Sequence, residues 1–355
     1  MSQDTATTEN QVTLGDILEL GIDTQASDLH FGANERIGLR INGKICFVDN
    51  IPPLTPEQAE KIIFDLLPND EQKETLLRTR EMDTSFEYTD GTSFRVNVFY
   101  KKRNISAVLR RIPREAFTMD NLGVPDAVSS LLSKKQGLIL VTGPTGSGKS
   151  TTMQSMLEYI NQNRVEHILT IEDPIEFLFT SKKYIFSQRE VGDDTLSFAN
   201  ALKAALREDP DVVMIGEMRD PETIMAAMNL AETGHLVIST LHTSSAAQTV
   251  SRLVNAFPGD QQNQVKSRLA DSLVGVVSQR LIPRCDKAGR IAIFELMIIN
   301  AALRNIIRSG DTGQIANAIQ AGRGIGMIKM ETYAEELRLR NIVRPEDYMH
   351  YFTED

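Results

Sequence analysis

The sequence predicts an α/β protein of two domains, and three observations support this. Residues 126–300 alternate short, continuously apolar strands with helical stretches, the pattern of a parallel sheet covered on both faces. Residues 13–112 instead show a hairpin signal and alternating strands, which predict a small α+β domain. Residues 113–125 contain two prolines, a glycine and few apolar residues in register, so we expect a linker there.

Composition limits the class of protein. The chain has 355 residues, which at roughly 150 residues per domain suggests about two domains. Its net charge is −10, from 38 Lys and Arg against 48 Asp and Glu, whereas a nucleic-acid-binding protein would need a basic domain or stripe. The acidic balance favours a soluble cytoplasmic protein. Two distant cysteines, Cys46 and Cys285, argue against a disulfide framework and against a four-thiolate zinc site.

The ends of the chain differ from its middle. Residues 1–12 are polar and lack an apolar segment, so we expect a disordered tail and no secretion signal. No stretch approaches the about 18–20 apolar residues of a membrane span, so we expect no direct membrane insertion. Residues 301–355 show helical patterns only, over 301–308, 314–320 and 330–340.

We expect the first domain to begin with a short amphipathic helix whose N-cap is Thr13. Asn42-Gly43 lies between two apolar runs, which is the strongest short hairpin signal. Further expected elements are helices over 56–67 and 70–77, strands over 94–100 and 105–112, and a turn at 101–104. In the second domain the expected strands are 137–142, 168–171, 212–215 and 236–241.

The strongest motif is a phosphate-binding loop. Residues 143–150 match its eight-residue pattern in full, after an apolar strand and before a helix expected over 151–161. Its glycines let backbone N–H groups turn toward phosphates, and the helix N-terminus adds its dipole. We expect Lys149 to reach the β- and γ-phosphates and the Ser150 hydroxyl to ligate Mg²⁺. The predicted nucleotide-binding residues are Gly143, Pro144, Thr145, Gly146, Ser147, Gly148, Lys149, Ser150 and Thr151.

Two carboxylates are candidates for acting on water. Hydrolysis needs a group near the γ-phosphate that orients or deprotonates water, and ligands bind at the carboxyl ends of parallel strands. The strand at 212–215 is followed by Gly216 and Glu217, and the strand at 168–171 by a segment that ends in Glu176. Such a strand usually ends in an Asp that helps to hold Mg²⁺. Gly216 stands just before the glutamate here, so a second protein contact to the metal stays open.

Histidines and arginines could complete the site. His235 and His242 bracket the strand at 236–241, and their odd spacing disfavours a shared metal site. His242 follows the carboxyl end, where it could contact the γ-phosphate side or make a structural hydrogen bond. Arginines cluster in the last strands of the first domain, and one could serve a neighbouring subunit's site. They are Arg95, Arg103, Arg110 and Arg111.

Two further arginines, Arg207 and Arg219, flank the strand at 212–215. Either could instead be structural, paired with a nearby acid. The acids within reach in sequence are Glu208, Asp209 and Asp220.

Several motifs in one order suggest a family. They are Ala-Ser-Asp-Leu-His at 26–30, the phosphate loop, Ile-Glu-Asp-Pro-Ile-Glu at 171–176, Val-Met-Ile-Gly-Glu-Met-Arg at 213–219 and Ala-Glu-Thr-Gly-His-Leu-Val-Ile-Ser-Thr-Leu-His at 231–242. Together they resemble the secretion-superfamily ATPases, specifically the type IV pilus retraction ATPases of the PilT family. The resemblance runs from about residue 13 to about residue 340.

The resemblance implies a fold, an assembly and roles for particular residues. It implies a PAS-like domain at 13–112, a RecA-like ATPase domain at 126–300 and a homohexamer that uses ATP and Mg²⁺. In that family the equivalent of Glu176 acts on the water, and Glu217 is the glutamate of the Walker B motif. Other site residues carried over from the family are the histidine pair His235 and His242 and the arginines Arg95 and Arg110.

The resemblance also implies a cellular role. Hexamers of this family couple ATP hydrolysis to pilus retraction and twitching motility. Implied partners are an inner-membrane pilus platform protein like PilC and a paralogous pilus ATPase. The implied location is the cytoplasm, at the inner face of the cytoplasmic membrane. Retraction as against extension rests on the resemblance and on no residue chemistry.

Some details leave the subtype open. The retraction class carries Ala-Ile-Arg-Asn-Leu-Ile-Arg-Glu, and residues 302–309 match it except that Ser309 replaces the final Glu. Residues 100–104 and 108–111 lean toward the accessory paralogue PilU, whereas Phe257-Pro258 leans toward PilT. Pilus-assembly and type II secretion ATPases usually carry a four-cysteine zinc motif, which this chain lacks. A catalytically weak adaptor is disfavoured by the intact Lys149 and by both candidate glutamates.

Overall fold

The computed structural model describes residues 12–41, 44–67, 69–112, 117–181, 185–287 and 289–352. They fall into two compact units, one of Met1–Arg114 with Glu176–Leu178 and one of Glu115–Ile175 with Phe179–Asp355. The expected tail lies outside the described residues up to residue 11, and so does the expected turn Asn42-Gly43. No helix among the described residues is long and apolar enough to cross a membrane.

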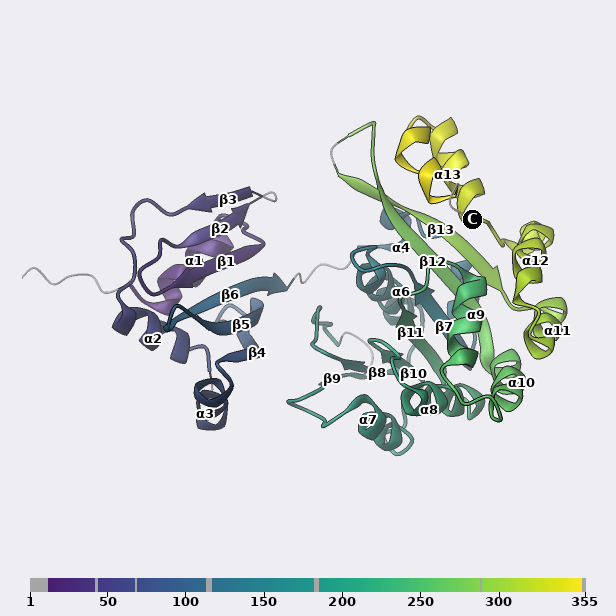
Figure 1. Ribbon diagram of the computed structural model, residues 1–355, viewed down its shortest axis with the longest axis horizontal. Helices are drawn as coiled ribbons and strands as arrows, with labels where there is room; N and C mark the ends of the chain where they lie inside the picture. Colours follow the sequence, from purple (N-terminus) through teal and green to yellow (C-terminus); the bar gives the residue numbers. More distant parts are fainter. Residues whose placement is uncertain are drawn as a thin grey trace, which may run out of the picture. The chain divides into compact units, whose positions relative to one another are not determined.

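The first unit is an α+β domain, as expected (Figure 1). Its described residues form an antiparallel sheet in the order β3-β2-β1-β6-β5-β4. The strands are β1 (Asp28–Gly32), β2 (Gly38–Ile41), β3 (Lys44–Phe47), β4 (Glu81–Glu87), β5 (Ser93–Lys101) and β6 (Asn104–Ile112), and the helices are α1 (Leu14–Asp23), α2 (Pro56–Phe64) and α3 (Asp70–Thr79).

Local signals explain these elements. Thr13 caps α1 in a capping box, in which its hydroxyl accepts from the Asp16 N–H and the Asp16 carboxylate accepts from the Thr13 N–H. Strands β2 and β3 pair with Ile41 opposite Lys44, so both strands of the predicted hairpin are confirmed. On β5 the apolar residues Phe94, Val96 and Val98 are fully buried, which leaves the alternate residues on the other face.

The second unit is built on a sheet in the order β13-β12-β7-β11-β10-β8-β9, in which β13 alone is antiparallel to its neighbour. Helices cover both faces (Figure 1). The strands are β7 (Gly137–Thr142), β8 (His167–Glu172), β9 (Ile185–Glu190), β10 (Val212–Ile215), β11 (Leu236–Leu241), β12 (Leu273–Pro283) and β13 (Arg290–Ile298). The helices are α4 (Met119–Leu122), α5 (Val128–Leu132), α6 (Lys149–Asn163), α7 (Phe198–Ala205), α8 (Pro221–Glu232), α9 (Ala246–Asn255), α10 (Gln262–Ser272), α11 (Ala301–Ser309), α12 (Ile315–Ala321) and α13 (Met330–Leu339).

Strand β7 shows why the continuous apolar runs form a doubly covered sheet. Leu138 and Leu140 join a core with helices α7 to α12, whereas Ile139 and Val141 join a second core with α4, α5 and α6. Because successive side chains of a strand point to opposite faces, only a strand apolar at every position can fill both cores.

The expected linker, 113–125, is wrong in its second half. Thr118 caps the short helix α4, and Met119 and Val124 are buried in the core beside α6. The Tyr333 hydroxyl donates a hydrogen bond to the carbonyl of Gly123. These residues therefore belong to the second unit. Four helical residues are too few to show a periodicity, which is why the sequence favoured a linker.

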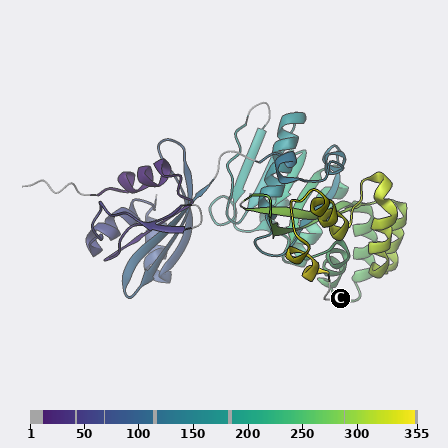
Figure 2. The same ribbon diagram turned by 90° about the horizontal axis from the view of Figure 1, so that it is seen from above.

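Two further expectations differ from the structure, namely a parallel sheet and a helical C-terminal region separate from the sheet domain. Strands β12 and β13 form a long antiparallel hairpin that the sequence analysis did not predict. The predicted C-terminal helices are confirmed, but Leu303, Ile307 and Ile315 belong to the core of the second unit's sheet. In both ribbon views these helices, coloured yellow-green to yellow, are packed as part of the second unit (Figures 1 and 2).

Candidate active site

The phosphate loop lies between β7 and α6 and needs its glycines. Gly143, Gly146 and Gly148 have φ angles of +153°, +75° and +86°, which L side chains rarely adopt. A methyl group added at Gly143 would lie 2.3 Å from the main-chain oxygen of Gln279. The loop is therefore packed directly on strand β12, and Lys149 begins α6 as the predicted context requires.

Two polar groups in this loop suit an anion. The buried Lys149 Nζ donates to the carbonyls of Gly143 at 2.9 Å and Pro144 at 3.1 Å, bonds that a phosphate could take over. The Ser147 hydroxyl is buried and has no hydrogen-bond partner among the described residues. Ser150 and Thr151 stand half-buried in the first turn of α6, where N–H groups and the helix dipole favour negative charge.

Glu217 lies beside this loop, because parallel strands bring the carboxyl ends of β7, β10 and β11 to one edge of the sheet. Its carboxylate pairs with Arg219 and lies 3.4 Å from the His242 Nε2. Burial raises the pKa of Glu217, but the hydrogen bonds from Arg219 and His242 and the charge of Arg219 outweigh burial and hold the pKa below its ordinary value. Glu217 is thus ionised at neutral pH.

His242 joins the loop to this carboxylate. Its Nδ1 lies 3.5 Å from the Lys149 Nζ, and its Nε2 faces Glu217. An ammonium group only donates and a carboxylate only accepts, so the network assigns the proton to Nε2 and leaves Nδ1 as the acceptor. The structure therefore brings together three predicted site residues, Lys149, Glu217 and His242.

The pairing of Arg219, which the sequence left open, is with Glu217 in the structure. Arg219 binds Glu217, whereas the carboxylate of Asp220 caps α8 by accepting from the N–H and hydroxyl of Thr223. The nearby Glu208 accepts from Arg189 at 2.7 Å. Arg219 is thus a partner of the site carboxylate, although the sequence could not distinguish it from a structural arginine.

Glu176 lies in the loop between β8 and β9, with an exposed side chain. The loop is tethered by Glu190, whose buried carboxylate accepts from the Ile175 N–H at 3.0 Å. Burial raises the pKa of Glu190, and the nearby acids Asp193, Asp194 and Asp173 raise it further, although the Ile175 N–H lowers it. Sequence reasoning missed Glu190, which lies opposite Glu172 at the end of the edge strand β9.

His235 does not join the group at the phosphate loop within this chain. It lies at the amino end of β11, where its Nδ1 is 3.0 Å from the Leu230 carbonyl and 3.3 Å from the Thr233 hydroxyl. That carbonyl is near the end of α8, so the ring bonds the carbonyl end of a helix. Six strand residues separate His235 from His242, and they place the two rings at opposite edges of the sheet.

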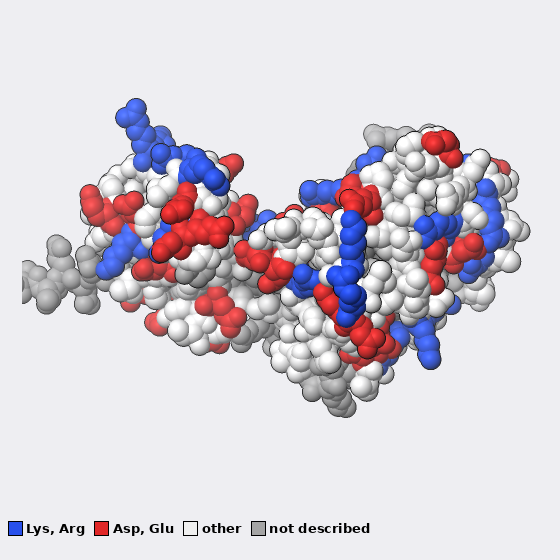
Figure 3. Space-filling view, turned by 90° about the horizontal axis from the view of Figure 1, so that it is seen from below, with Lys and Arg blue, Asp and Glu red and all other residues white. Residues whose placement is uncertain are grey.

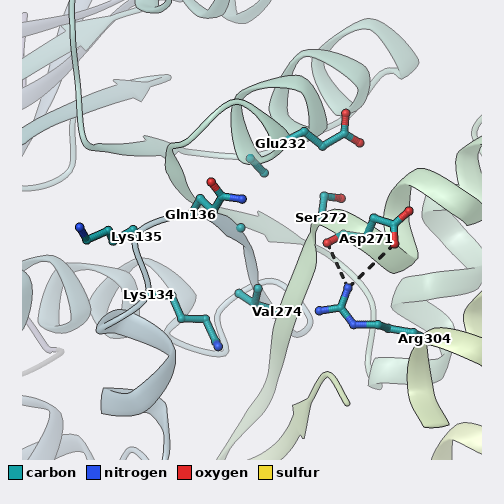
Figure 4. Close-up of a pocket in the computed structure, with 10 residues that line it drawn as sticks. Lys134, Lys135, Gln136, Glu232, Asp271, Ser272, Val274 and Arg304 are labelled. Atoms are coloured by element: carbon teal, nitrogen blue, oxygen red, sulfur yellow. Dashed lines mark hydrogen bonds and ion pairs between the residues drawn. The ribbon is translucent and has the colours of Figure 1, made fainter. Parts of the chain in front are cut away.

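The edge that holds His235 also carries a cavity of about 530 Å³ (Figure 4). Lys134, Lys135 and Glu232 are among the residues around it. Arg304 reaches in from α11 and donates to the carbonyls of Ala270 at 3.0 Å and Asp271 at 3.3 Å, at the end of α10. This cavity lies away from the phosphate loop, at the amino ends of β7 and β12.

Two of the four predicted arginines of the first unit, Arg95 and Arg110, lie in one row across the sheet. In the register of the sheet, Arg95 on β5 lies opposite Arg110 on β6. Asp28 on β1 lies opposite Arg110 on one side and opposite Arg40 of β2 on the other. The buried Asp28 carboxylate accepts from the Arg110 Nε at 2.8 Å and lies 3.5 Å from Arg40. Asp28 and Arg40 were missed, although Asp28 stands in the motif at 26–30.

Figure 3 shows acidic and basic side chains interspersed over the face drawn, with no broad field of one sign. Among the described residues, no group of three or more His, Cys, Asp or Glu side chains is arranged to hold a metal ion. Cys46 and Cys285 are both free and exposed.

The fold and the site define a P-loop ATPase, with Lys149, His242 and Glu217 at the carboxyl edge of a mostly parallel sheet. The family model described as type II/IV secretion system protein matches residues 4–332. The chain therefore belongs to the type II/IV secretion system protein family, the secretion-superfamily ATPases.

Individual relatives narrow the comparison. The Pseudomonas aeruginosa type IV pilus retractation ATPase PilT is 44% identical over 332 residues, 94% of this chain and 96% of that protein. Type IV pilus ATPase PilU of the same organism is 35% identical over 331 residues, 93% of this chain and 86% of that protein. A crystal structure of the pilus retraction motor PilT with bound ADP matches at 44% identity and a TM-score of 0.90, covering 97% of this chain and 98% of the other. The chain is a near full-length homologue of PilT.

Proposed function

We propose that this chain is the ATPase motor of type IV pilus retraction, in which ATP hydrolysis drives pilin disassembly and twitching motility. One observation carries the proposal: Lys149, His242 and Glu217 form a contiguous group in a chain 44% identical to PilT over 94% of its length. A group arranged for turnover favours a motor over an adaptor that only binds nucleotide.

In the proposed reaction, Lys149 exchanges its loop carbonyls for the β- and γ-phosphate oxygens. Glu217 and Glu176 orient and deprotonate the attacking water, and His242 contacts the γ-phosphate. Ser150 and the nucleotide phosphates would hold Mg²⁺, which neutralises phosphate charge when bound. The hydroxyl of Ser150 in the first turn of α6 suits this role, whereas Gly216 offers no carboxylate to the ion.

The proposed motor is a homohexamer, and Arg95 and Arg110 complete a site in a neighbouring subunit. The row on β5, β6, β1 and β2 supports this, because three arginines around one carboxylate leave a net charge of +2 for an anion. Mixed rings of Arg110→Ala and Glu217→Gln subunits test this idea. Complementation in trans predicts that some sites regain activity, and no rescue in verified mixed rings would contradict it.

The proposed partner is an inner-membrane platform protein of the PilC kind, which the motor meets at the cytoplasmic face of the membrane. An accessory role, together with a paralogous retraction ATPase, is the second candidate. The 35% identity to PilU favours that candidate less than the 44% identity to PilT favours the first. Ser309 in place of the family's final Glu is a departure within the segment that characterises the retraction class.

Deletion of the gene in its source organism tests the proposal, with surface pili counted and surface motility scored. Complementation with Glu217→Gln supplies the matched control, because the protein is present but its turnover is blocked. Excess pili with lost motility, restored only by the wild-type gene, is the expected result. Absent pili would mean that the chain drives assembly, and normal pili with altered motility would indicate the accessory role.

A further inference from the structure

Strand β12 meets the phosphate loop at a buried glutamine that no motif of the sequence analysis contains. Strands β12 and β7 pair in parallel, with Ser278 opposite Thr142, the last residue before the loop. The Thr142 hydroxyl donates to the Ser278 hydroxyl at 2.9 Å. The next residue, Gln279, is only 1% exposed. An apolar strand thus becomes polar just where the loop begins.

The Gln279 side chain is bound to the loop itself. Its Nε2 donates to the carbonyl of Ser147 at 2.7 Å, and both atoms are buried. Since a carbonyl only accepts, the amide nitrogen must face the loop, and this fixes the orientation of the side-chain amide. The Oε1 of Gln279 has no partner among the described residues. The amide nitrogen is therefore the atom of this side chain that binds the loop.

This hydrogen bond fixes the direction of a neighbouring amide. In a trans peptide the C=O and the following N–H point in opposite directions, and the one cis bond among the described residues is Asp173–Pro174. Because the Ser147 carbonyl is held on the β12 side, the Gly148 N–H is turned away from Gln279. Gly148 is the N-cap of α6, where backbone N–H groups bind phosphate.

We propose that Gln279 is a positioning residue that aims the Gly148 amide at the nucleotide phosphates. One further contact holds the loop on β12. The main-chain oxygen of Gln279 lies so close to Gly143 that an added methyl group would be 2.3 Å from it. Without the Gln279 donor, the Ser147–Gly148 peptide can rotate, and the loop must be ordered again when nucleotide binds.

Two variants separate this role from simple packing. Gln279→Met keeps the length and removes the donor, whereas Gln279→Glu sets a carboxylate oxygen against the Ser147 carbonyl. Ser278→Ala is the matched control. It removes a buried hydroxyl at the adjacent position, and that hydroxyl bonds the Thr142 side chain and not a loop carbonyl. Because the inference rests on nucleotide binding at the phosphate loop, Lys149→Ala is measured in parallel. Tight ADP binding by Lys149→Ala would refute the site itself, whatever Gln279 does.

The measurements are the ADP dissociation constant of the full chain by calorimetry with Mg²⁺ present, and the KM and kcat for ATP. We expect Gln279→Met to raise the ADP dissociation constant and the KM for ATP about tenfold, with a smaller proportional fall in kcat. Gln279→Glu should bind ADP more weakly than Gln279→Met does, and Ser278→Ala should bind ADP like the wild type. Where Gln279→Glu fails to fold, Gln279→Met decides. ADP affinity within about twofold of wild type for Gln279→Met, or an equal loss in Ser278→Ala, would overturn the proposal.

Discussion

The two edges of the ATPase sheet use the same kinds of side chain for different purposes. His242 at the carboxyl edge contacts Lys149 and Glu217, side chains from other elements. His235 at the amino edge bonds the last turn of α8, and Arg304 there bonds the end of α10. The carboxyl edge receives helix N-termini, whose free N–H groups suit an anion, whereas the amino edge receives helix C-termini, whose free carbonyls need donors. Strand direction therefore decides which polar residues can act on a ligand.

The largest effect on nucleotide binding should follow from removing the ammonium group at the carboxyl edge. In Lys149→Ala the charge-assisted hydrogen bonds to phosphate are lost, each worth roughly 1.5–3 kcal/mol. We expect ATP affinity, measured by calorimetry, to fall at least about 100-fold. Unchanged affinity would remove Lys149 from the site.

Glu217→Gln should separate binding from turnover. The amide keeps the shape of the side chain but cannot take a proton from water, so we expect kcat to fall roughly 10²–10⁴-fold, the range for general bases. ATP affinity should stay close to the wild-type value. Turnover near the wild-type rate in a steady-state assay would show that Glu217 does no chemistry.

The sequence predicted the loop and its immediate partners well for physical reasons. The spacing of Gly143, Gly146 and Gly148 is a backbone requirement that a pattern can express, and parallel topology places Glu217 and His242 at the same edge. These residues lie where the sequence placed them because each placement depends on local sequence and on one topological rule, whereas their chemical roles stay predictions.

What the sequence missed depends on contacts between distant segments. Gln279 reaches the loop only because β12 is the neighbour of β7, and Asp28 faces Arg110 only through sheet register. The resemblance grouped His235 with His242, but within one chain a strand length separates them. Glu190 was missed because nothing local shows that its carboxylate holds the Ile175 N–H.

Substitutions at the amino edge should lower the stability of the fold and leave kcat unchanged. Arg304→Met removes two hydrogen bonds to the end of α10, which we expect to cost about 1–2 kcal/mol and to lower Tm by about 2–8 °C. Arg308→Met is the matched control, because its pair with Asp271 is exposed and worth less than about 1 kcal/mol. A kcat loss in Arg304→Met at unchanged Tm would break the contrast between the edges.

Glu190 gives a pH-dependent prediction of smaller size. Its pKa is raised in the folded protein, so its contribution to stability is fully present below the unfolded value of about 4.3 and is lost as pH rises through the folded pKa. Glu190→Gln keeps an acceptor for the Ile175 N–H and cannot ionise. We expect its Tm to exceed that of the wild type by about 2–4 °C at pH 7–8, with the advantage gone near pH 4. An advantage independent of pH would refute burial of the ionised group as the cause.

The paired histidines test the contrast most directly, with kcat, ATP affinity and Tm measured together for His242→Gln and His235→Gln. The account predicts that His242→Gln lowers kcat by about tenfold or more at unchanged Tm. It predicts that His235→Gln lowers stability by about 0.5–1.5 kcal/mol, through the lost bond to Leu230, and leaves the kcat of the folded protein near the wild-type value. A loss of kcat in His235→Gln as large as in His242→Gln, at unchanged Tm, would contradict the assignment of chemistry to one edge of the sheet.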